Sequence, residues 1–210
     1  MARETGPKCK ICRREGKKLF LRGERCYSPK CAIVKRKYPP GQHGPKGFSR
    51  ASEYGQQLRE KQKLKRTYGI LERQLKKYFD KAKKSVSNTE FQLLRLLETR
   101  IDNVIFKAGF LSSRNASRQL ISHGHILVNG KRIDIPSYAV KVGDEISVKE
   151  SSKTKKSIQE NLTAGKGKKR ELTWFTVDEK NLKIKIAKHP DEEELLQDID
   201  TRLIIEFYSR

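Results

Sequence analysis

Long hydrophobic runs are missing from this sequence of 210 residues. The longest unbroken apolar runs span about three residues, whereas a membrane-spanning helix needs about 20. This lack excludes an integral membrane protein. The first residues also contain no apolar stretch of the signal-peptide type, so we expect the protein to stay in the cytoplasm, where it is made. Apolar residues make up only 35% of the chain, so each hydrophobic core should be small.

Acidic residues are scarce in the first half of the chain. The formal net charge of the protein is +23, and 19 of these excess positive charges lie in residues 1–100. A region with one sign of charge suits a phosphate polyanion, because each Lys or Arg placed on the phosphate backbone releases counterions. A flexible basic tail is the alternative, but such tails lack cysteines and amphipathic helices. The N-terminal half is therefore the predicted nucleic-acid-binding surface.

Cysteine is absent outside two close pairs, Cys9 with Cys12 and Cys26 with Cys31. Spacings of two to four intervening residues are typical of turns whose thiolates converge on one tetrahedral Zn²⁺. Disulfides are disfavoured in a reducing compartment. We therefore expect one structural metal ion held by all four cysteines, with Zn²⁺ favoured and an iron–sulfur cluster left open.

The middle of the chain has helical periodicity. Ser52 is a candidate N-cap of a helix that ends at Gly69, and a second helix is expected over about 71–84. Both helices carry Lys and Arg on faces that we expect to be exposed. Asn88 is a candidate cap of a third helix, whose apolar stripe continues through Ile105.

A compact pattern of one helix and several strands follows. Ser113 is a candidate cap of a short helix that ends at Gly124. Asn129 and Gly130 suit the turn of a two-residue hairpin, and residues 142–148 predict a further strand. Together these segments predict a helix pair packed against a small antiparallel sheet.

The last part of the chain contains two further features. Residues 203–207 are strand-like, being rich in isoleucine, leucine and phenylalanine. Acidic residues gather between 191 and 200, and an RNA surface would expel them. Three interpretations of this acidic run stay open: it folds back on the basic half, it faces a basic protein partner, or it forms a solvated helix face.

Several segments resemble a known family. Residues 113–121, 123–130 and 142–146 are similar to the small RNA-binding module named after the fourth small-subunit ribosomal protein. Pseudouridine synthases, a heat-shock ribosome-recycling protein and tyrosyl-tRNA synthetases also contain this module. Four other segments resemble the bacterial ribosomal protein family itself: 13–16, 40–44, 58–63 and 205–210. The chain is identified as a member of that family, in its four-cysteine, metal-binding form.

The resemblance implies an α+β fold. An N-terminal metal knuckle and basic helices would precede a small helix-pair and antiparallel-sheet module, inserted as a second domain. The expected divisions are a knuckle (1–45), a basic helical region (46–90), the RNA-binding module (91–150) and a C-terminal helix with strands packing on the body (151–210).

The resemblance also implies a structural protein that binds the 5′ region of small-subunit ribosomal RNA and nucleates assembly of the subunit body. Recognition should rest on phosphates, ribose hydroxyls and junction shape, because side chains cannot read the narrow major groove of A-form RNA. Resemblance and local charge assign to RNA binding Arg3, Lys8, Arg13, Arg14, Arg22, Arg25, Lys35, Arg36, His43, Lys61, Lys63, Arg66, Arg114, Arg118 and His123.

Further partners follow from the resemblance. Members of the family line the messenger RNA entrance channel of the small subunit, and the corresponding positions here are Lys46 and Arg50. The C-terminal portion would meet the fifth small-subunit ribosomal protein, an interface that affects translational accuracy. We expect no membrane partner and no small-molecule substrate.

An RNA-modifying enzyme with the same module is the main competing class. Residues 100–102 resemble the Arg-Leu-Asp motif that carries the catalytic aspartate of pseudouridine synthases. We expect Asp102 to lie inside an apolar-striped helix, however, and no space remains for a catalytic domain of ordinary size. A phosphate-binding loop with a P-loop spacing is also missing. A metal-dependent transcriptional regulator is a weaker alternative, since the helix pair leads directly into strands. The protein is therefore predicted not to be an enzyme.

Overall fold

The computed structural model of the chain describes residues 5–46, 51–149, 152–165, 172–195 and 199–210. The chain forms two compact units, one made of Met1–Glu90 with Leu196–Arg210 and the other of Phe91–Leu195. Among the helices in the described ranges, none combines the length and the apolar character needed to cross a membrane. The boundaries that the sequence suggests after residues 45, 90 and 150 stay predictions.

The first unit begins with short helical segments around the cysteines. These are α1 (Lys8–Glu15), the 3₁₀ helix η1 (Gly23–Cys26), α2 (Ala32–Lys35) and the 3₁₀ helix η2 (Gly44–Lys46). A small apolar cluster joins Ile11, Cys12 and Leu19, with Leu21 packed against it. It buries far less apolar surface than the core of the second unit.

Longer helices complete the first unit. Helix α3 (Glu53–Tyr68) begins at Ser52, whose hydroxyl accepts a hydrogen bond from the backbone N–H of Gly55 at 3.2 Å. It ends at Gly69, whose φ of 61° is the left-handed conformation that favours glycine. Helix α4 (Glu72–Lys83) follows. The helices predicted over these two segments are confirmed.

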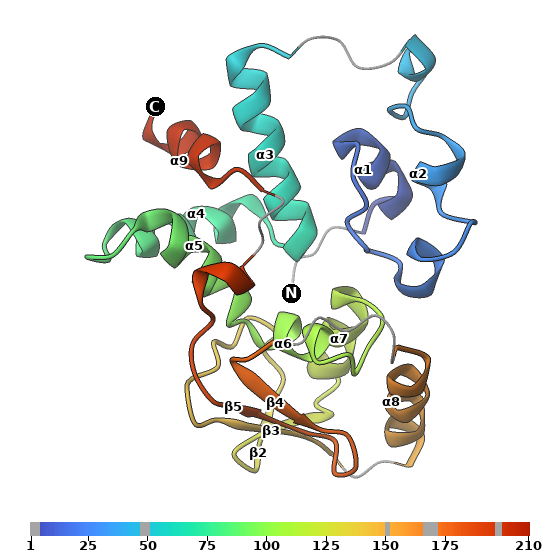
Figure 1. The fold of residues 1–210 in the computed structure, drawn as a ribbon, viewed down its shortest axis with the longest axis vertical. Coiled ribbons are helices and arrows are strands. Elements are labelled where there is room, and N and C mark those ends of the chain that lie inside the picture. Colours follow the sequence, from blue (N-terminus) through green and yellow to red (C-terminus); the bar gives the residue numbers. More distant parts are fainter. Residues whose placement is uncertain (1–4, 47–50, 150–151, 166–171, 196–198) are drawn as a thin grey trace. The chain divides into compact units, whose positions relative to one another are not determined.

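Helix α9 (Thr201–Ser209) packs along α3, although some 140 residues separate them in the chain (Figure 1). The carboxylate of Asp200 caps it by accepting a first-turn backbone N–H at 3.0 Å. The strand predicted for residues 203–207 is therefore wrong. The β-branched residues favour a strand locally, but helical spacing buries Ile204 completely and directs the aromatic side chains toward α3 and α4.

A cluster of polar and aromatic groups holds α9 to its neighbours. The Tyr208 hydroxyl donates to Glu72 Oε1 on α4 at 2.7 Å, and Lys61 Nζ on α3 donates to the same oxygen at 2.8 Å. Lys61 Nζ also lies 4.2 Å from the centroid of the Phe207 ring, which is a cation–π contact. These contacts join three helices around one carboxylate.

Acidification should weaken this cluster. Burial alone raises the pKa of Glu72, but the hydrogen bonds from Lys61 and Tyr208 lower it more, so its pKa lies below the ordinary value of 4.5. A depressed carboxyl pKa gives stabilisation that is present above the unfolded-state value and is lost as pH falls through the folded-state value. We expect the urea midpoint of the first unit to fall as pH drops below 4.5. A Glu72→Gln variant should lack this part of the pH dependence, and an unaltered dependence in that variant would contradict the assignment.

The helices of the second unit differ from the sequence-based expectation. The third helix, expected to continue from Asn88 through Ile105, is interrupted and forms α5 (Thr89–Glu98) and α6 (Ile101–Lys107). At the break Arg100 is extended and bridges to Ala139, and the N–H of Ile101 donates to the carbonyl of Tyr138 at 2.9 Å. Backbone pairing with a segment almost 40 residues away overrides the continuous apolar stripe.

A five-stranded antiparallel sheet with the order β2-β1-β3-β5-β4 forms the other layer of this unit. Its strands are β1 (Ile126–Val128), β2 (Lys131–Ile133), β3 (Glu145–Val148), β4 (Phe175–Asp178) and β5 (Lys183–Ile186). Asn129 and Gly130 have φ values of 50° and 76°, as a two-residue hairpin turn of type I′ requires. The hairpin, the strand β3 and the α+β class are therefore confirmed.

Helices α6, α7 (Arg114–Ser122) and α8 (Ser152–Gly165) contribute apolar side chains to the core of the second unit. Trp174, just before β4, is completely buried in that core. Strands β4 and β5 thus extend the sheet of the module, whereas the sequence suggested that the C-terminal portion packs on the rest of the body.

The acidic run has an internal structural role. Asp191 and Glu194 form a capping box on a 3₁₀ helix, η3 (Glu192–Glu194). Glu194 Oε1 also accepts the backbone N–H of Thr173 at 2.6 Å, and Asp191 pairs with Lys188. Asp191 and Glu194 therefore stabilise the loop before and around η3, so part of the acidic charge is taken up by contacts within the protein.

Candidate nucleic-acid interface

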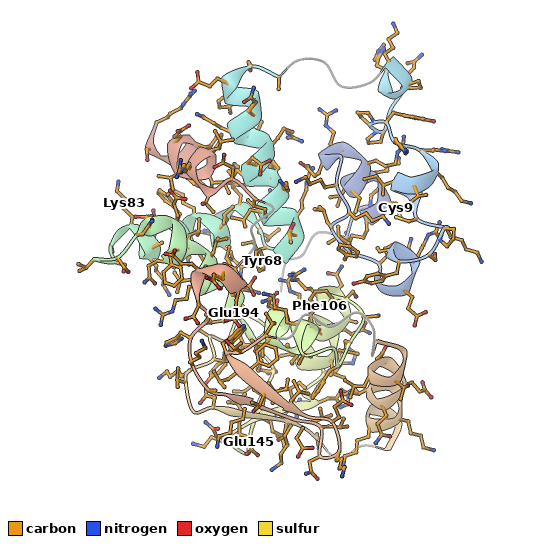
Figure 2. The ribbon with its side chains drawn as sticks, viewed as in Figure 1. Cys9, Tyr68, Lys83, Phe106, Glu145 and Glu194 are labelled. Carbon is orange, nitrogen blue, oxygen red and sulfur yellow. The ribbon has the colours of Figure 1, made fainter. Side chains whose placement is uncertain are left out.

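The four cysteines lie on the short helices of residues 5–46. Cys9 and Cys12 belong to α1, Cys26 ends η1, and Cys31 precedes α2. Figure 2 labels Cys9 in this blue N-terminal segment. The side chains of Cys12, Cys26 and Cys31 are buried and that of Cys9 is half-buried.

The thiols influence one another electrostatically. Burial raises the pKa of Cys12, the backbone N–H of Leu19 opposes this by hydrogen bonding, and the other three cysteines raise it further. Burial likewise raises the pKa of Cys26, against a hydrogen bond from the N–H of Arg22 to Sγ at 3.3 Å. Within the described residues, His, Cys, Asp and Glu side chains form no group of three or more arranged to hold a metal ion. The four-cysteine metal site stays a prediction.

Glu15 connects the cysteine-bearing helix α1 to α3. Its side chain is only 1% exposed and forms ion pairs with Arg66 and, at 3.4 Å, with Arg59. Burial raises the pKa of Glu15, while the two guanidinium groups oppose that shift. Part of the positive charge on α3 is therefore neutralised inside the unit.

Exposed cations gather in the N-terminal segment. Of the residues assigned to RNA or messenger RNA, those with exposed side chains are, in this segment, Arg14, Arg22, Arg25, Lys35, Arg36, His43 and Lys46, and, in the second unit, His123. Lys8 is half-buried. Arg3 and Arg50 lie outside the described residues. The exposed members have the accessibility that phosphate binding requires.

Other predicted RNA-binding residues contact the protein itself. Arg13 donates from Nε to the carbonyl of Tyr38 at 3.0 Å and from Nη2 to that of Pro39 at 3.1 Å. Lys61 and Lys63 are only 5% and 6% exposed, and Lys63 Nζ pairs with Glu60 at 3.0 Å. The expectation that both lysines lie on an exposed face is wrong. Lys61 pairs with Glu72 on α4 and lies against the Phe207 ring of α9. Their assignment to RNA binding stays a prediction.

The arginines of α7 are held by buried polar groups. Asp102 Oδ2 accepts Arg118 Nε at 2.8 Å and Arg100 Nη2 at 2.7 Å, while Arg100 Nε reaches Oδ1 at 3.0 Å. Asp102 and Arg100 are only 1% and 2% exposed. Asp102 lies in the first turn of α6, not in the middle of a long helix. Asp102 therefore fixes two guanidinium groups, which gives the residues of the enzyme-like motif a structural role.

A parallel arrangement holds Arg114. Its Nε donates to Asn103 Oδ1 at 2.8 Å, and its guanidinium lies 4.5 Å from the centroid of the Phe106 ring, which is labelled in Figure 2. The amide of Asn103 in turn donates to Glu98 Oε2 at 2.6 Å. This support was missed from sequence, since nothing in local spacing indicates that Glu98 and Asn103 are completely buried.

Arg132 is a further cation that sequence reasoning missed. Its guanidinium lies over Gly124, where a Cβ atom would overlap it. Gly124 separates His123 from His125, whose ring centroids are 6.2 Å apart. A sequence signal for this residue does exist. Gly124 stands between two histidines directly before β1, and Arg132 lies on β2, the strand that pairs with β1.

Comparing Gly124→Ala with Gly130→Ala should distinguish the effect of moving Arg132 from the effect of backbone strain. Gly124 has a φ of 71°, and Gly130 has a similar φ but open space around its missing Cβ. Both alanine variants should lose about 1 kcal/mol of unfolding free energy from the left-handed backbone. Only Gly124→Ala displaces Arg132, so it alone should weaken RNA binding several-fold. Equal RNA affinities of the two variants would show that Arg132 does not contribute to RNA binding.

Similar proteins identify the family. The sequence matches the families described as "Ribosomal protein S4/S9 N-terminal domain" over residues 3–98 and "S4 domain" over residues 99–146. A protein of Thermus thermophilus named small ribosomal subunit protein uS4 is 52% identical over 210 residues, which is 100% of both chains. Its namesake from Natranaerobius thermophilus is 50% identical over the same full length. The chain therefore belongs to the uS4 family of small-subunit ribosomal proteins.

Proposed function

We propose that this protein is a structural component of the small ribosomal subunit that binds ribosomal RNA in the cytoplasm and catalyses no reaction. The end-to-end similarity to proteins named for the small ribosomal subunit carries this conclusion. The exposed cations of the N-terminal segment and the S4 domain of the second unit supply the surfaces for RNA.

Binding would combine two kinds of cation. Exposed groups such as Arg14, Arg25 and Arg36 would neutralise phosphates, a contribution that weakens as salt rises. Arg114 and Arg118 are oriented by their protein partners, and such guanidinium groups lose little side-chain entropy when they bind. The remaining assigned residues would add to the same surfaces, including Arg3, Lys8, Arg13, Lys35, His43, Lys61, Lys63, Arg66 and His123.

The four cysteines would hold one structural Zn²⁺. Their fit is supported by three buried thiols and by the backbone N–H of Arg22, which donates to Cys26 Sγ at 3.3 Å. Bound zinc would keep Cys9, Cys12, Cys26 and Cys31 as thiolates and supply the folding energy that the small apolar cluster lacks. An iron–sulfur cluster on the same ligands is the alternative.

We also propose where on the small subunit the protein binds and which partners it meets there. The protein would bind the 5′ region of the RNA and nucleate assembly of the subunit body. Lys46, which is exposed at the end of η2, and Arg50 would line the messenger RNA entrance. The C-terminal region would meet the fifth small-subunit protein and thereby influence translational accuracy.

Sedimentation tests the proposed function. An affinity-tagged copy expressed in a bacterial host should sediment with the small subunit on a sucrose gradient and resist a wash at high salt. An otherwise identical gradient treated with ribonuclease should release the protein to the top. A tagged protein found only at the top of the untreated gradient would overturn the proposal.

A further inference from the structure

An aromatic pair beside the cysteines is not explained by the contacts described so far. The rings of Phe20 and Tyr27 stack with centroids 5.0 Å apart and planes inclined by 30°. Tyr27 is 47% exposed, which makes it one of the exposed large hydrophobic residues in the described part of the chain. The pair therefore presents aromatic surface to the outside of the first unit.

The backbone at Phe20 is strained. Its φ is 51°, in the left-handed region that bulky residues seldom occupy. Such conformations persist when surrounding structure fixes them, and they concentrate at functional positions. Leu19, directly before it, is buried in the apolar cluster that also contains Cys12. The fixed neighbour thus keeps the Phe20 ring beside Tyr27.

Tyr27 is fixed in the same manner. It follows Cys26, whose sulfur accepts the N–H of Arg22, and its own N–H donates to the carbonyl of Glu24 at 3.0 Å. Each ring therefore belongs to a residue next to one that is tied to a cysteine. A rigid ring pair loses little conformational freedom on binding a flat ligand.

Positive charge surrounds the pair in the sequence. The cations within the same turn region have exposed side chains, and they are Lys17, Lys18, Arg22, Arg25 and Lys30. An exposed aromatic face among cations matches a nucleotide, since the base stacks on the ring while the cations neutralise its phosphates. A protein partner would suit an apolar ring pair less well here, because charged residues are depleted at the centres of protein interfaces.

We propose that Phe20 and Tyr27 form a stacking platform for an unpaired nucleobase of the ribosomal RNA. This inference rests on the proposed function and adds a contact that does not depend on charge. Tyr27 supplies the exposed face, and Phe20 supports it from behind.

Two substitutions separate stacking from packing. Tyr27→Phe keeps the aromatic face, whereas Tyr27→Leu keeps apolar contact with Phe20 but loses the face. In filter binding to a 5′ fragment of small-subunit ribosomal RNA, Tyr27→Leu should bind about tenfold more weakly and Tyr27→Phe should bind as the unsubstituted protein does. The salt dependence of affinity should be unchanged in both, while Arg25→Ala should reduce its slope by about one.

A spectroscopic readout tests stacking directly. Fluorescent 2-aminopurine is placed in turn at unpaired positions of the RNA fragment, and one position should be quenched by the unsubstituted protein and by Tyr27→Phe but not by Tyr27→Leu. Equal affinity and equal quenching for the unsubstituted protein and Tyr27→Leu would overturn the platform. Failure of the unsubstituted protein to bind the fragment would instead refute the proposed function.

Discussion

Replacing Asp102 by alanine should lower the free energy of unfolding of the second unit by about 3–5 kcal/mol, the range for removing one partner of a buried ion pair. Arg100 is only 2% exposed and would be left with an uncompensated charge. Arg118 would lose the same carboxylate. Urea unfolding monitored by the fluorescence of Trp174, which is completely buried in this unit, measures the effect.

A matched control uses another aspartate of the same unit. Asp134 follows β2 and is exposed, so Asp134→Ala should change stability by less than about 0.5 kcal/mol. The Asp102→Asn variant keeps the shape of the side chain but removes its charge, and it should be destabilised as well. If Asp102→Ala and Asp134→Ala unfold at the same urea concentration, the buried network does not support α6 and α7.

Removal of the proposed zinc ion should unfold the cysteine-bearing segment. Residues 5–46 bury a small apolar cluster, so their folding free energy should come mainly from thiolate–metal bonds. The purified protein should contain one zinc per chain, and a strong chelator should make this segment sensitive to proteases. Cys12→Ser should reproduce the effect and reduce RNA affinity by at least tenfold, because Arg14, Arg22, Arg25 and the Phe20–Tyr27 pair would lose their fixed positions.

The second unit provides the internal control for this experiment. None of its described residues is a cysteine, so its sheet should keep its protease resistance in the chelator. Iron and inorganic sulfide in place of zinc would support the iron–sulfur alternative. A metal-free protein whose residues 5–46 remain protected would contradict a structural metal.

Local rules explain the parts of the fold that sequence reasoning predicted correctly. Ser52 and Ser113 cap helices through their hydroxyls, Gly69 ends α3, and Asn129 with Gly130 makes a hairpin turn. Each depends on the conformational preference of one or two residues.

Contacts between distant segments explain what was missed. The apolar stripe from α5 to α6 is interrupted because Arg100 bridges to Ala139, and residues 203–207 are helical because α9 packs on α3. Local periodicity contains no information about either partner.

The candidate site likewise combines features that local sequence predicts with features that depend on contacts between distant residues. Sequence identified the positive charge of the N-terminal half but not which cations the protein neutralises itself. Lys61 pairs with Glu72 across 11 residues, and Arg66 pairs with Glu15 across 51. Formal charge therefore overestimates the cations that remain accessible to RNA, and burial is needed to separate the two groups.

A salt titration of RNA binding tests the central claim most directly. Filter binding would measure the affinity of the metal-loaded protein for two RNAs of equal length. One is a 5′ fragment of small-subunit ribosomal RNA, and the other is an unrelated structured RNA. We expect tight binding to the ribosomal fragment alone, with affinity that falls steeply as salt rises. Equal affinity for both RNAs at every salt concentration would mean that the protein is a nonspecific basic coat, and it would contradict recognition of ribosomal RNA.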